Sequence, residues 1–407
     1  MDRRTVLKGL GVGTAMSFVP WATHAKTGRQ PIGYARTNWS RDPFSYGSYS
    51  HIPTGAKRRD IRALEQPIED RIFFAGEAVY PNRNSTVHAA HESGRRTAKA
   101  VLKTNAQRIG IIGAGISGLT AAHMLSERGR AVTVLEARDR IGGRIWTDES
   151  LGFPIDLGAS WIHGVKQNPL TRLSNDIDIE RLRTRDDYIV RGKDGREIPD
   201  REFPDWLEGV TSVQHSAAAD PGTLNEWAYW NSTDYSGYDV VFPGGYSQIL
   251  EAFSGVYDIR LEAEVRAVSL QENGVVIGLK DDDTLDFDAV IVTLPLGVLK
   301  QDQVRFIPDL PGEKRHAIER LGMGTLDKLY LLYDNVFWDA DSTWILTPEN
   351  DLPKGHFNQW LNLAPYIGQP LLVGLNGGTP ALELAGFSDE AIVAKGIQAL
   401  DLAYPLA

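Results

Sequence analysis

The chain has 407 residues, a length that suggests two or three domains rather than one small module. Hydrophobic residues make up 42% of it and charged residues 24%, which excludes a disordered, collagen-like or coiled-coil protein. The net charge of −10 disfavours a nucleic-acid partner, because phosphate binding requires a basic surface, and it favours a cationic ligand.

The first 25 residues are typical of a twin-arginine export signal. Arg3 and Arg4 precede a mildly apolar stretch from Gly9 to Trp21, and small residues up to Ala25 suit a signal peptidase. This stretch is shorter than the ~20 apolar residues of a membrane span, so we expect no stable membrane insertion. We expect a bacterial protein that is exported by the twin-arginine route and is periplasmic or secreted.

The next hundred residues predict loops, one strand and one helix. Residues 26–60 indicate loops with short strands, and Arg71–Ala75 indicates a buried strand. A helix is expected over Thr86–Lys103, with Ser85 as its N-cap. A basic connector then leads, at about residue 108, to the next strand.

Residues 109–135 predict a strand, a glycine turn, a helix and a second strand, which together form a βαβ unit. The polar and aromatic region 165–240 indicates short helices over a pocket. The remaining predicted elements are β-strands over 256–299, ending in a run buried on both faces at 289–294, strands at 328–333 and 371–375, and a closing helix at 388–404.

The glycine turn of the βαβ unit is typical of a dinucleotide site. Gly113 permits a tight turn, Gly115 lets the backbone approach a pyrophosphate, and Gly118 lets the helix pack on the strand. The helix N-terminus then meets the phosphate charge. Glu136 ends the next strand, where it can accept hydrogen bonds from a ribose diol.

A second glycine pair, Gly142 and Gly143, lies among Arg138, Arg140 and Arg144. Arginine can bind a diphosphate with two parallel hydrogen bonds. This segment favours FAD over NAD as the dinucleotide.

Six segments of the chain resemble the flavin-containing amine oxidases, nearest the branch of polyamine oxidases and lysine-specific histone demethylases. The segments are Ala75–Ala78, Gly113–Gly118, Glu136–Arg144, Asp156–Gly164, Pro243–Tyr246 and Gly322–Lys328. The resemblance implies an α/β fold: a Rossmann-type FAD-binding domain with an interleaved α+β substrate-binding domain.

The order of these segments differs from that of the family. The part resembling residues 32–103 ends the family chain, after the helix that resembles 388–404, so this chain resembles a circular permutation. After the predicted signal peptide at 1–25, the resemblance implies substrate-domain segments at 26–70, 165–240 (helical) and 301–407, and FAD-domain segments at 71–164 and 241–300.

The resemblance also implies which residues contact FAD. Glu77 lies near the ribityl and pyrophosphate groups, the helix that begins at Thr86 points at the flavin N1 and C2 carbonyl, and Val265 contacts adenine. Ser48 stands where monoamine oxidases carry a flavin-linking cysteine, and the chain has no cysteine, so FAD is expected to be non-covalent. The implied cofactor residues are Gly113, Gly115, Ser117, Gly118, Glu136, Ala137, Arg138, Gly143, Arg144, Ala159, Ser160, Trp161, Val265, Glu77, Thr86 and Val87.

Three residues receive catalytic roles from the resemblance. Lys328 holds a water on flavin N5 and assists reoxidation, Tyr49 packs on the substrate amine, and Thr86 replaces the second aromatic residue of monoamine oxidases. From the sequence alone, Lys328 could equally pair with Asp327 or another acid on an exposed strand. His163 is either a substrate contact or a structural histidine.

The implied reaction is hydride transfer from the carbon beside a neutral amine to flavin N5, followed by imine hydrolysis and reoxidation by O2 to give H2O2. One alternative is a flavin desaturase or porphyrinogen oxidase, and another is a non-catalytic flavoprotein. His88 and His91 resemble a metal pair, but the sequence offers no evident third ligand, so no metal is expected. The particular amine and the oligomeric state are not predicted.

Overall fold

A five-stranded parallel sheet forms one end of the molecule. The computed structural model describes residues 29–81, 83–231 and 234–406, so the predicted export signal lies outside the described residues. The strand order is β12-β5-β4-β16-β3. The bounds are Asp258–Arg260 (β12), Ala131–Leu135 (β5), Arg108–Ile112 (β4), Ala289–Val292 (β16) and Ile72–Phe74 (β3).

The predicted βαβ unit is present in this sheet. β4 and β5 are parallel neighbours, and α3 (Ile116–Ser126) connects them. α2 (Val87–Val101) packs closely on α3, since a Cβ at Gly94 would lie 2.2 Å from the carbonyl oxygen of Ser117. β16 is buried along its whole length, as expected for a strand that lies between β4 and β3 and is covered on one face by α2 and α3 and on the other by residues of a further sheet, such as Val275 and Phe287.

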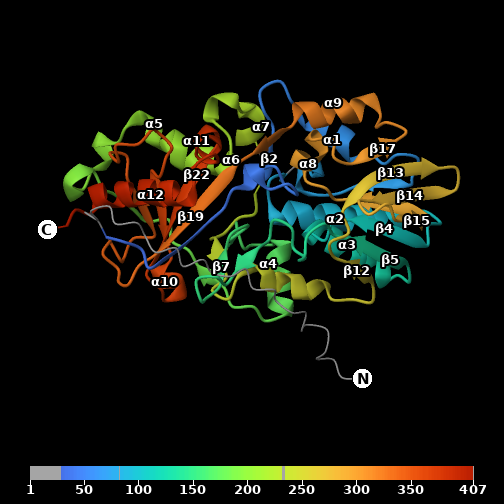
Figure 1. Ribbon diagram of the computed structural model, residues 1–407, viewed down its shortest axis with the longest axis horizontal. Helices are drawn as coiled ribbons and strands as arrows, with labels where there is room; N and C mark the ends of the chain where they lie inside the picture. Colours follow the sequence, from blue (N-terminus) through green and yellow to red (C-terminus); the bar gives the residue numbers. More distant parts are fainter. Residues whose placement is uncertain (1–28, 82, 232–233, 407) are drawn as a thin grey trace.

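A six-stranded, mostly antiparallel sheet forms the other end of the molecule (Figure 1). Its order is β1-β19-β22-β21-β20-β10, and α12 (Asp389–Ala403) packs on it beside Leu329 and Trp360. The bounds are Gly33–Arg36 (β1), Leu326–Leu332 (β19), Leu371–Gly377 (β22), Gln359–Asn362 (β21), Trp344–Leu346 (β20) and Tyr188–Val190 (β10).

Smaller elements join the two sheets and confirm the expected α/β class with two interleaved parts. β2 (Tyr49–His51) lies between the two ends (Figure 1) and pairs with β18 (Gly322–Gly324). The four-stranded sheet β15-β14-β13-β17 comprises Thr284–Phe287, Gly274–Leu279, Val265–Gln271 and Arg305–Ile307. The other strands are β6 (Thr147–Asp148), β7 (Ile155–Asp156), β8 (Trp161–Ile162), β9 (Leu182–Arg183) and β11 (Val240–Val241).

Region 165–240 contains the predicted short helices and also the short strands β9, β10 and β11, which weak periodicity could not reveal. The remaining helices are α1 (Arg58–Glu65), α4 (Pro169–Asp176), α5 (Asp205–Glu208), α6 (His215–Ala217), α7 (Glu226–Trp230), α8 (Leu296–Lys300), α9 (Gly312–Arg320), α10 (Ala364–Ile367) and α11 (Thr379–Leu384). Across the described ranges, none of the helices is both long and apolar enough to cross a membrane.

The predicted N-cap of α2 is wrong by one residue. Thr86, not Ser85, caps the helix, because Thr86 Oγ1 accepts a hydrogen bond from the backbone N–H of Ala89 at 3.1 Å. Ser85 has a φ of +75° and belongs to the turn before the helix. Its backbone N–H donates to Glu77, which fixes the turn beside the cavity described next.

Candidate active site

A cavity of about 940 Å³ extends from the glycine turn of β4 to the six-stranded sheet. Of the residues predicted for the site, it is lined by Tyr49, Glu77, Thr86, Val87, Gly113, Gly115, Ser117, Glu136, Ala137, Arg138, Gly143, Arg144, Ala159, Ser160, Trp161, His163, Val265 and Lys328. Gly118 does not line it. The fold therefore brings residues from the first hundred and the last hundred positions to one cavity.

The three glycines of the turn have different roles, and one of them leaves space for a ligand. Gly113 has a φ of +107°, and a Cβ at Gly118 would lie 2.0 Å from the carbonyl oxygen of Gly113, so turn and packing require these two glycines. Gly115 has a φ of −70°, and a Cβ there would meet only the oxygen of Gly142, at 4.0 Å. No contact within the described part of the protein requires glycine at position 115. A pyrophosphate that lies directly against the backbone there does require it.

The polar groups around this turn fit a dinucleotide. Gly115 is the N-cap residue of α3 and provides no side-chain cap, so the first N–H groups of the helix can meet an anion. Ser117 Oγ is buried at the cavity wall and has no hydrogen-bond partner within the described ranges. Glu136 is 6% exposed and accepts from Ala114 N at 2.7 Å and Arg138 N at 2.9 Å, which leaves carboxylate lone pairs for a ribose diol.

The guanidinium groups of Arg138 and Arg140 have hydrogen-bond partners within the protein. Arg140 does not line the cavity, since its guanidinium donates to the carbonyls of Ile141 and Gly143 at 3.2 and 3.0 Å. Arg138 lines the cavity but donates both sides of its fork to Asp42, at 3.0 and 2.7 Å. These contacts shape the glycine pair and hold the N-terminal segment against the cofactor site. The sequence did not reveal Asp42 as the partner.

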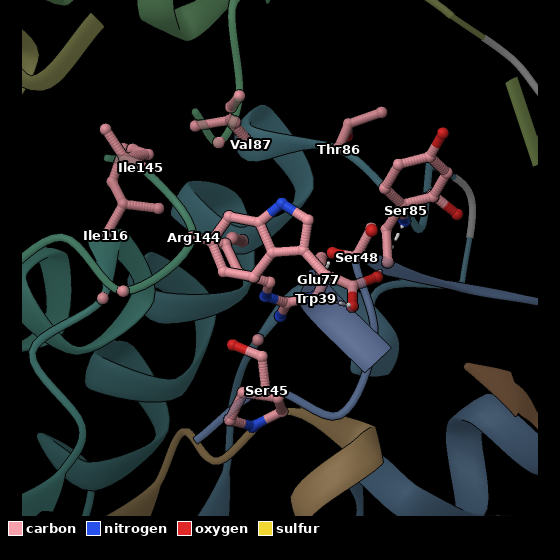
Figure 2. A pocket seen from close by; sticks show the side chains of 18 of the residues that line it. Trp39, Ser45, Ser48, Glu77, Ser85, Thr86, Val87, Ile116, Arg144 and Ile145 are labelled. Carbon is pink, nitrogen blue, oxygen red and sulfur yellow. Dashed lines mark hydrogen bonds and ion pairs between the residues drawn. The ribbon is translucent and has the colours of Figure 1, made fainter. Parts of the chain in front are cut away.

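Glu77 and Arg144 form the centre of the cavity wall (Figure 2). Glu77 is 5% exposed and accepts hydrogen bonds from Arg144 Nη1 at 2.9 Å, Ser50 Oγ at 2.6 Å and Ser85 N at 2.9 Å. Arg144 Nη1 also donates to the carbonyl of Ser48 at 2.9 Å. This network joins β2, the turn before α2 and the arginine segment, so the site residues are positioned before any ligand binds.

The N-terminus of α2 faces the same cavity. Thr86 and Val87 line it, and the helix has 15 residues. The partial positive charge of a helix N-terminus stabilises nearby negative charge by about 0.3–2 kcal/mol. A contact of Thr86 and Val87 with the N1 side of a flavin stays a prediction.

Lys328 is buried on β19 and is 6% exposed, which contradicts the alternative of a surface lysine paired with Asp327. Its Nζ donates to the carbonyls of Asp156 and Gly158 at 2.7 and 2.6 Å and to Ser160 Oγ at 2.6 Å. All three ammonium protons are thus used by the loop that carries Ala159 to Trp161. Burial lowers the pKa of Lys328 to about 8.

Asp156 and Tyr330 support this lysine and were not predicted as site residues. Tyr330 OH donates to the carbonyl of Asp156 at 2.6 Å, and the Asp156 carboxylate accepts from Thr147 Oγ1 at 2.6 Å. Burial raises the pKa of Asp156 to about 6. Asp156 begins one of the six segments that resemble the family. Its backbone carbonyl is the acceptor for Lys328 and Tyr330, and a sequence cannot show which backbone carbonyls act as acceptors.

Tyr49 and Ser48 line the cavity near its junction with the six-stranded sheet. The Tyr49 hydroxyl donates to the carbonyl of His215, and burial raises its pKa. Ser48 Oγ donates to Leu326 O at 2.9 Å and accepts from Leu326 N at 2.8 Å. Ser48 therefore joins β2 to β19.

The far wall of the cavity is aromatic. Trp161 stacks with His163 and with Trp344, in both cases at 6.1 Å between ring centroids. His163 Nδ1 lies 2.6 Å from Asp239 Oδ2. His163 thus lines the cavity and also has a structural partner. Trp344 was missed because nothing in its own segment marks it.

The two histidines of α2 contact neighbouring side chains. His91 Nδ1 lies 2.9 Å from Thr120 Oγ1, and the His88 ring packs edge-on against Tyr235. Wherever residues are described, no group of three or more His, Cys, Asp or Glu side chains is arranged to hold a metal ion.

Comparison with known proteins places this geometry in a family. The family described as flavin containing amine oxidoreductase matches residues 18–102, 116–215 and 193–407. Probable polyamine oxidase 4 of Arabidopsis thaliana is 33% identical over 342 residues, covering 69% of this chain and 68% of the relative. Polyamine oxidase 2 of the same species is 30% identical over 350 residues, covering 71% of each chain.

A demethylase homologue and a solved oxidase are also similar. Lysine-specific histone demethylase 1 homolog 1 of Oryza sativa is 29% identical, covering 71% of this chain and 42% of that protein. The structure of cyclohexylamine oxidase from Brevibacterium oxydans shares the fold at a TM-score of 0.58 and 22% identity, covering 74% of this chain and 81% of that chain. With these matches and the dinucleotide cavity, the chain belongs to the flavin-containing amine oxidoreductases and is an FAD-dependent amine oxidase.

Proposed function

We propose that the protein oxidises a primary or secondary amine that carries a second positive charge, as diamines and polyamines do. The observation that carries this proposal is the composition of the cavity's outer wall, where Asp186, Asp234 and Asp239 lie among aromatic residues. Carboxylates and aromatic faces both attract cations. The polyamine oxidase relatives, and the fold shared with a putrescine oxidase at a TM-score of 0.54, support the same class.

Residues at one end of the cavity would bind the cofactor, and residues at the other end would bind the amine. FAD, when bound, supplies the acceptor for two electrons. The α3 N-terminus, Ser117 and Glu136 would hold its dinucleotide part, while Tyr49 and Trp161 enclose the reacting end of the amine. The apolar wall there favours the neutral amine over the ammonium by desolvation. Overall, amine, O2 and water give a carbonyl product, the released amine or ammonia, and H2O2.

The test is a peroxide assay of the FAD-loaded protein with spermine, spermidine, putrescine, cyclohexylamine, benzylamine, amino acids and a porphyrinogen. We expect the highest kcat/KM for a substrate with two or more amino groups, and we expect it to fall as salt rises, because screening weakens attraction to the acidic wall. A preference for cyclohexylamine or benzylamine that salt does not change would refute the second-charge requirement. Turnover of porphyrinogen alone would refute amine oxidation.

FAD is proposed to bind without a covalent bond. The chain has no cysteine, and both hydrogen-bonding capacities of Ser48 Oγ engage Leu326. Acid precipitation should therefore leave the yellow colour in the supernatant, whereas a coloured pellet would contradict the proposal.

The order of the chain is proposed to be a circular permutation of the family's order. Arg29 Nη1 donates to the carbonyl of Tyr404 at 2.6 Å, so the two ends of the described chain lie side by side. A short connector between α2 and β4, which Thr104 stabilises by hydrogen bonds to Val101 and Ala106, replaces the ends that a family chain would have. Relatives match about 70% of this chain, close to the share that follows Gln107.

A reordered gene tests the permutation. It begins at Arg108, runs to Leu406, and continues through a short flexible linker into residues 29–103. We expect this protein to fold, to bind FAD and to oxidise the same amines, because it restores the family order without moving any element. A reordered chain that is expressed but insoluble would count against the proposal.

Export by the twin-arginine route is proposed from Arg3 and Arg4, the mildly apolar stretch that follows them and the small residues up to Ala25. Cell fractionation should find the protein in the periplasm or medium, and the double change R3K and R4K should retain it in the cytoplasm. An unchanged distribution would contradict the proposed signal.

A further inference from the structure

His215 lies in an unusual backbone setting beside the reacting end of the cavity. It begins α6 directly after the π-helical segment Gly209–Gln214. π-Helical turns are rare and occur frequently at functional sites. Ala218, which ends α6, has a φ of +53°, in the left-handed region that disfavours a residue with a Cβ. Two sparsely populated conformations therefore flank this histidine.

The position of the His215 ring is fixed from both sides. The hydroxyl of Tyr49 donates to the His215 carbonyl. A Cβ at Gly377 on β22 would lie 3.0 Å from His215 Cδ2 and 2.8 Å from the carbonyl oxygen of Gln214, so glycine there lets α6 approach the sheet. His215 is among the residues that line the cavity, yet it is only 7% exposed.

The hydrogen bond at one ring nitrogen determines the state of the other. His215 Nδ1 lies 2.5 Å from Gln359 Oε1. An amide oxygen only accepts, so Nδ1 carries the proton. Burial lowers the pKa of His215 to about 4, so the ring is neutral and Nε2 has a free lone pair.

The lone pair of His215 Nε2 accepts no hydrogen bond within the described part of the protein. Nε2 is buried and has no hydrogen-bond partner among the residues that the structure describes. A buried acceptor without a partner costs about 1–3 kcal/mol, which makes it an expected site of a ligand contact. Lys328 offers only donors and Gln359 Oε1 already binds Nδ1, so neither supplies an acceptor for an amine N–H.

We propose that His215 is a substrate-recognition residue whose Nε2 accepts a hydrogen bond from the N–H of the reacting amine. This proposal rests on the amine oxidation described above and deepens it. A neutral primary or secondary amine has an N–H for this contact, whereas a neutral tertiary amine has none. His215 therefore favours primary and secondary amines over tertiary amines at the reacting nitrogen.

The experiment compares two substrates in three proteins. The substrates are the N-methyl and N,N-dimethyl derivatives, at the reacting nitrogen, of the amine with the highest turnover. The proteins are the wild type, His215→Asn and His215→Gln. The shorter Asn side chain can reach only the Nδ1 position, where it keeps the contact with Gln359, whereas the Gln side chain can place an amide oxygen at the Nε2 position.

We expect the wild type to prefer the secondary amine by about 100-fold in kcat/KM, because a site built to bind an N–H rejects an analogue that lacks it. His215→Asn should reduce this preference to about 3-fold at unchanged FAD content, and His215→Gln should restore part of it. A purely structural histidine would change stability and both substrates together, so the ratio separates the two roles.

Binding provides a second readout that does not depend on turnover. Anaerobic calorimetric titration of the fully reduced, FAD-loaded protein with the N-methyl and N,N-dimethyl derivatives of putrescine gives dissociation constants, because the reduced flavin cannot oxidise the amine. These should show the same ordering among the three proteins. A wild type that accepts both substitution states equally, or a His215→Asn variant with the wild-type ratio, overturns the role of His215. Loss of all amine turnover with the binding preference intact would instead refute the proposed function.

Discussion

Gly115→Val should fold and yet fail to bind FAD. Gly115 has φ −70° and ψ 169°, an extended conformation that valine adopts readily, and a Cβ there meets only Gly142 O at 4.0 Å. The added methyl groups would occupy the space beside the N-terminus of α3. Forcing atoms into a packed contact costs about 1–3 kcal/mol, and the pyrophosphate would also lose its backbone contacts, so we expect the FAD affinity to fall at least about 100-fold.

Gly312→Val is the matched control. Gly312 begins α9, a Cβ there meets nothing within 4 Å, and the residue does not line the cavity. Both variants should show the circular dichroism of the wild-type apoprotein, while only Gly115→Val should remain colourless after incubation with excess FAD. Wild-type affinity in Gly115→Val would mean that the glycine turn does not hold the pyrophosphate.

Lys328→Met should slow the reaction of the reduced enzyme with O2 by about 100-fold. Negative charge develops on oxygen in this step, and a buried cation stabilises such charge far better than water does. The three hydrogen bonds of Nζ hold the charge in place against the 156–160 loop. The rate is measured by rapid mixing of the reduced, FAD-loaded protein with oxygenated buffer.

Tyr330→Phe separates the charge from the hydrogen bonds. Tyr330 lies on the same strand, and its hydroxyl donates to the same Asp156 carbonyl at 2.6 Å, so the change removes a loop contact and no charge. Tyr330→Phe should lower the melting temperature but change the O2 rate less than about threefold. An equal loss of rate in both variants would assign the effect to the loop rather than to the ammonium.

The pH dependence gives an independent check on Lys328. Its pKa is lowered to about 8, so the ammonium is present below that pH and is lost as the pH rises through it. The O2 rate of the wild type should therefore fall above about pH 8. The rate of Lys328→Met should stay flat over the same range, and a parallel decline in both proteins would exclude the lysine as its cause.

Local sequence patterns predicted the elements around the cofactor well. The strand and glycine turn before α3, the buried run of β16 and the closing helix α12 all lie where hydrophobic periodicity and turn residues placed them. These patterns depend on neighbours in the chain, so a sequence records them directly. The N-cap of α2 differs by one residue because two adjacent hydroxyl residues, Ser85 and Thr86, compete for the same role.

The partners of charged residues were much less predictable. The guanidinium of Arg138 donates hydrogen bonds to Asp42, a partner that the sequence did not indicate. The ammonium of Lys328 donates to backbone carbonyls and not to Asp327. The acceptor at His215 depends on Gln359, far along the chain. Each of these contacts joins distant segments. Where the acceptor is a backbone carbonyl, the side chain of that residue is not constrained, so the sequence gives no signal.

The parallel pairing of β3 with β16 determines when, during synthesis of the chain, the dinucleotide-binding sheet can form. Ile72 lies opposite Val290 and Phe74 opposite Val292, so the dinucleotide-binding sheet joins segments made early and late in translation. Such non-local pairing raises contact order and slows folding. A nascent chain that ends before β16 cannot complete this sheet. The dinucleotide-binding sheet can thus be completed only after the segment that carries β16 has been made.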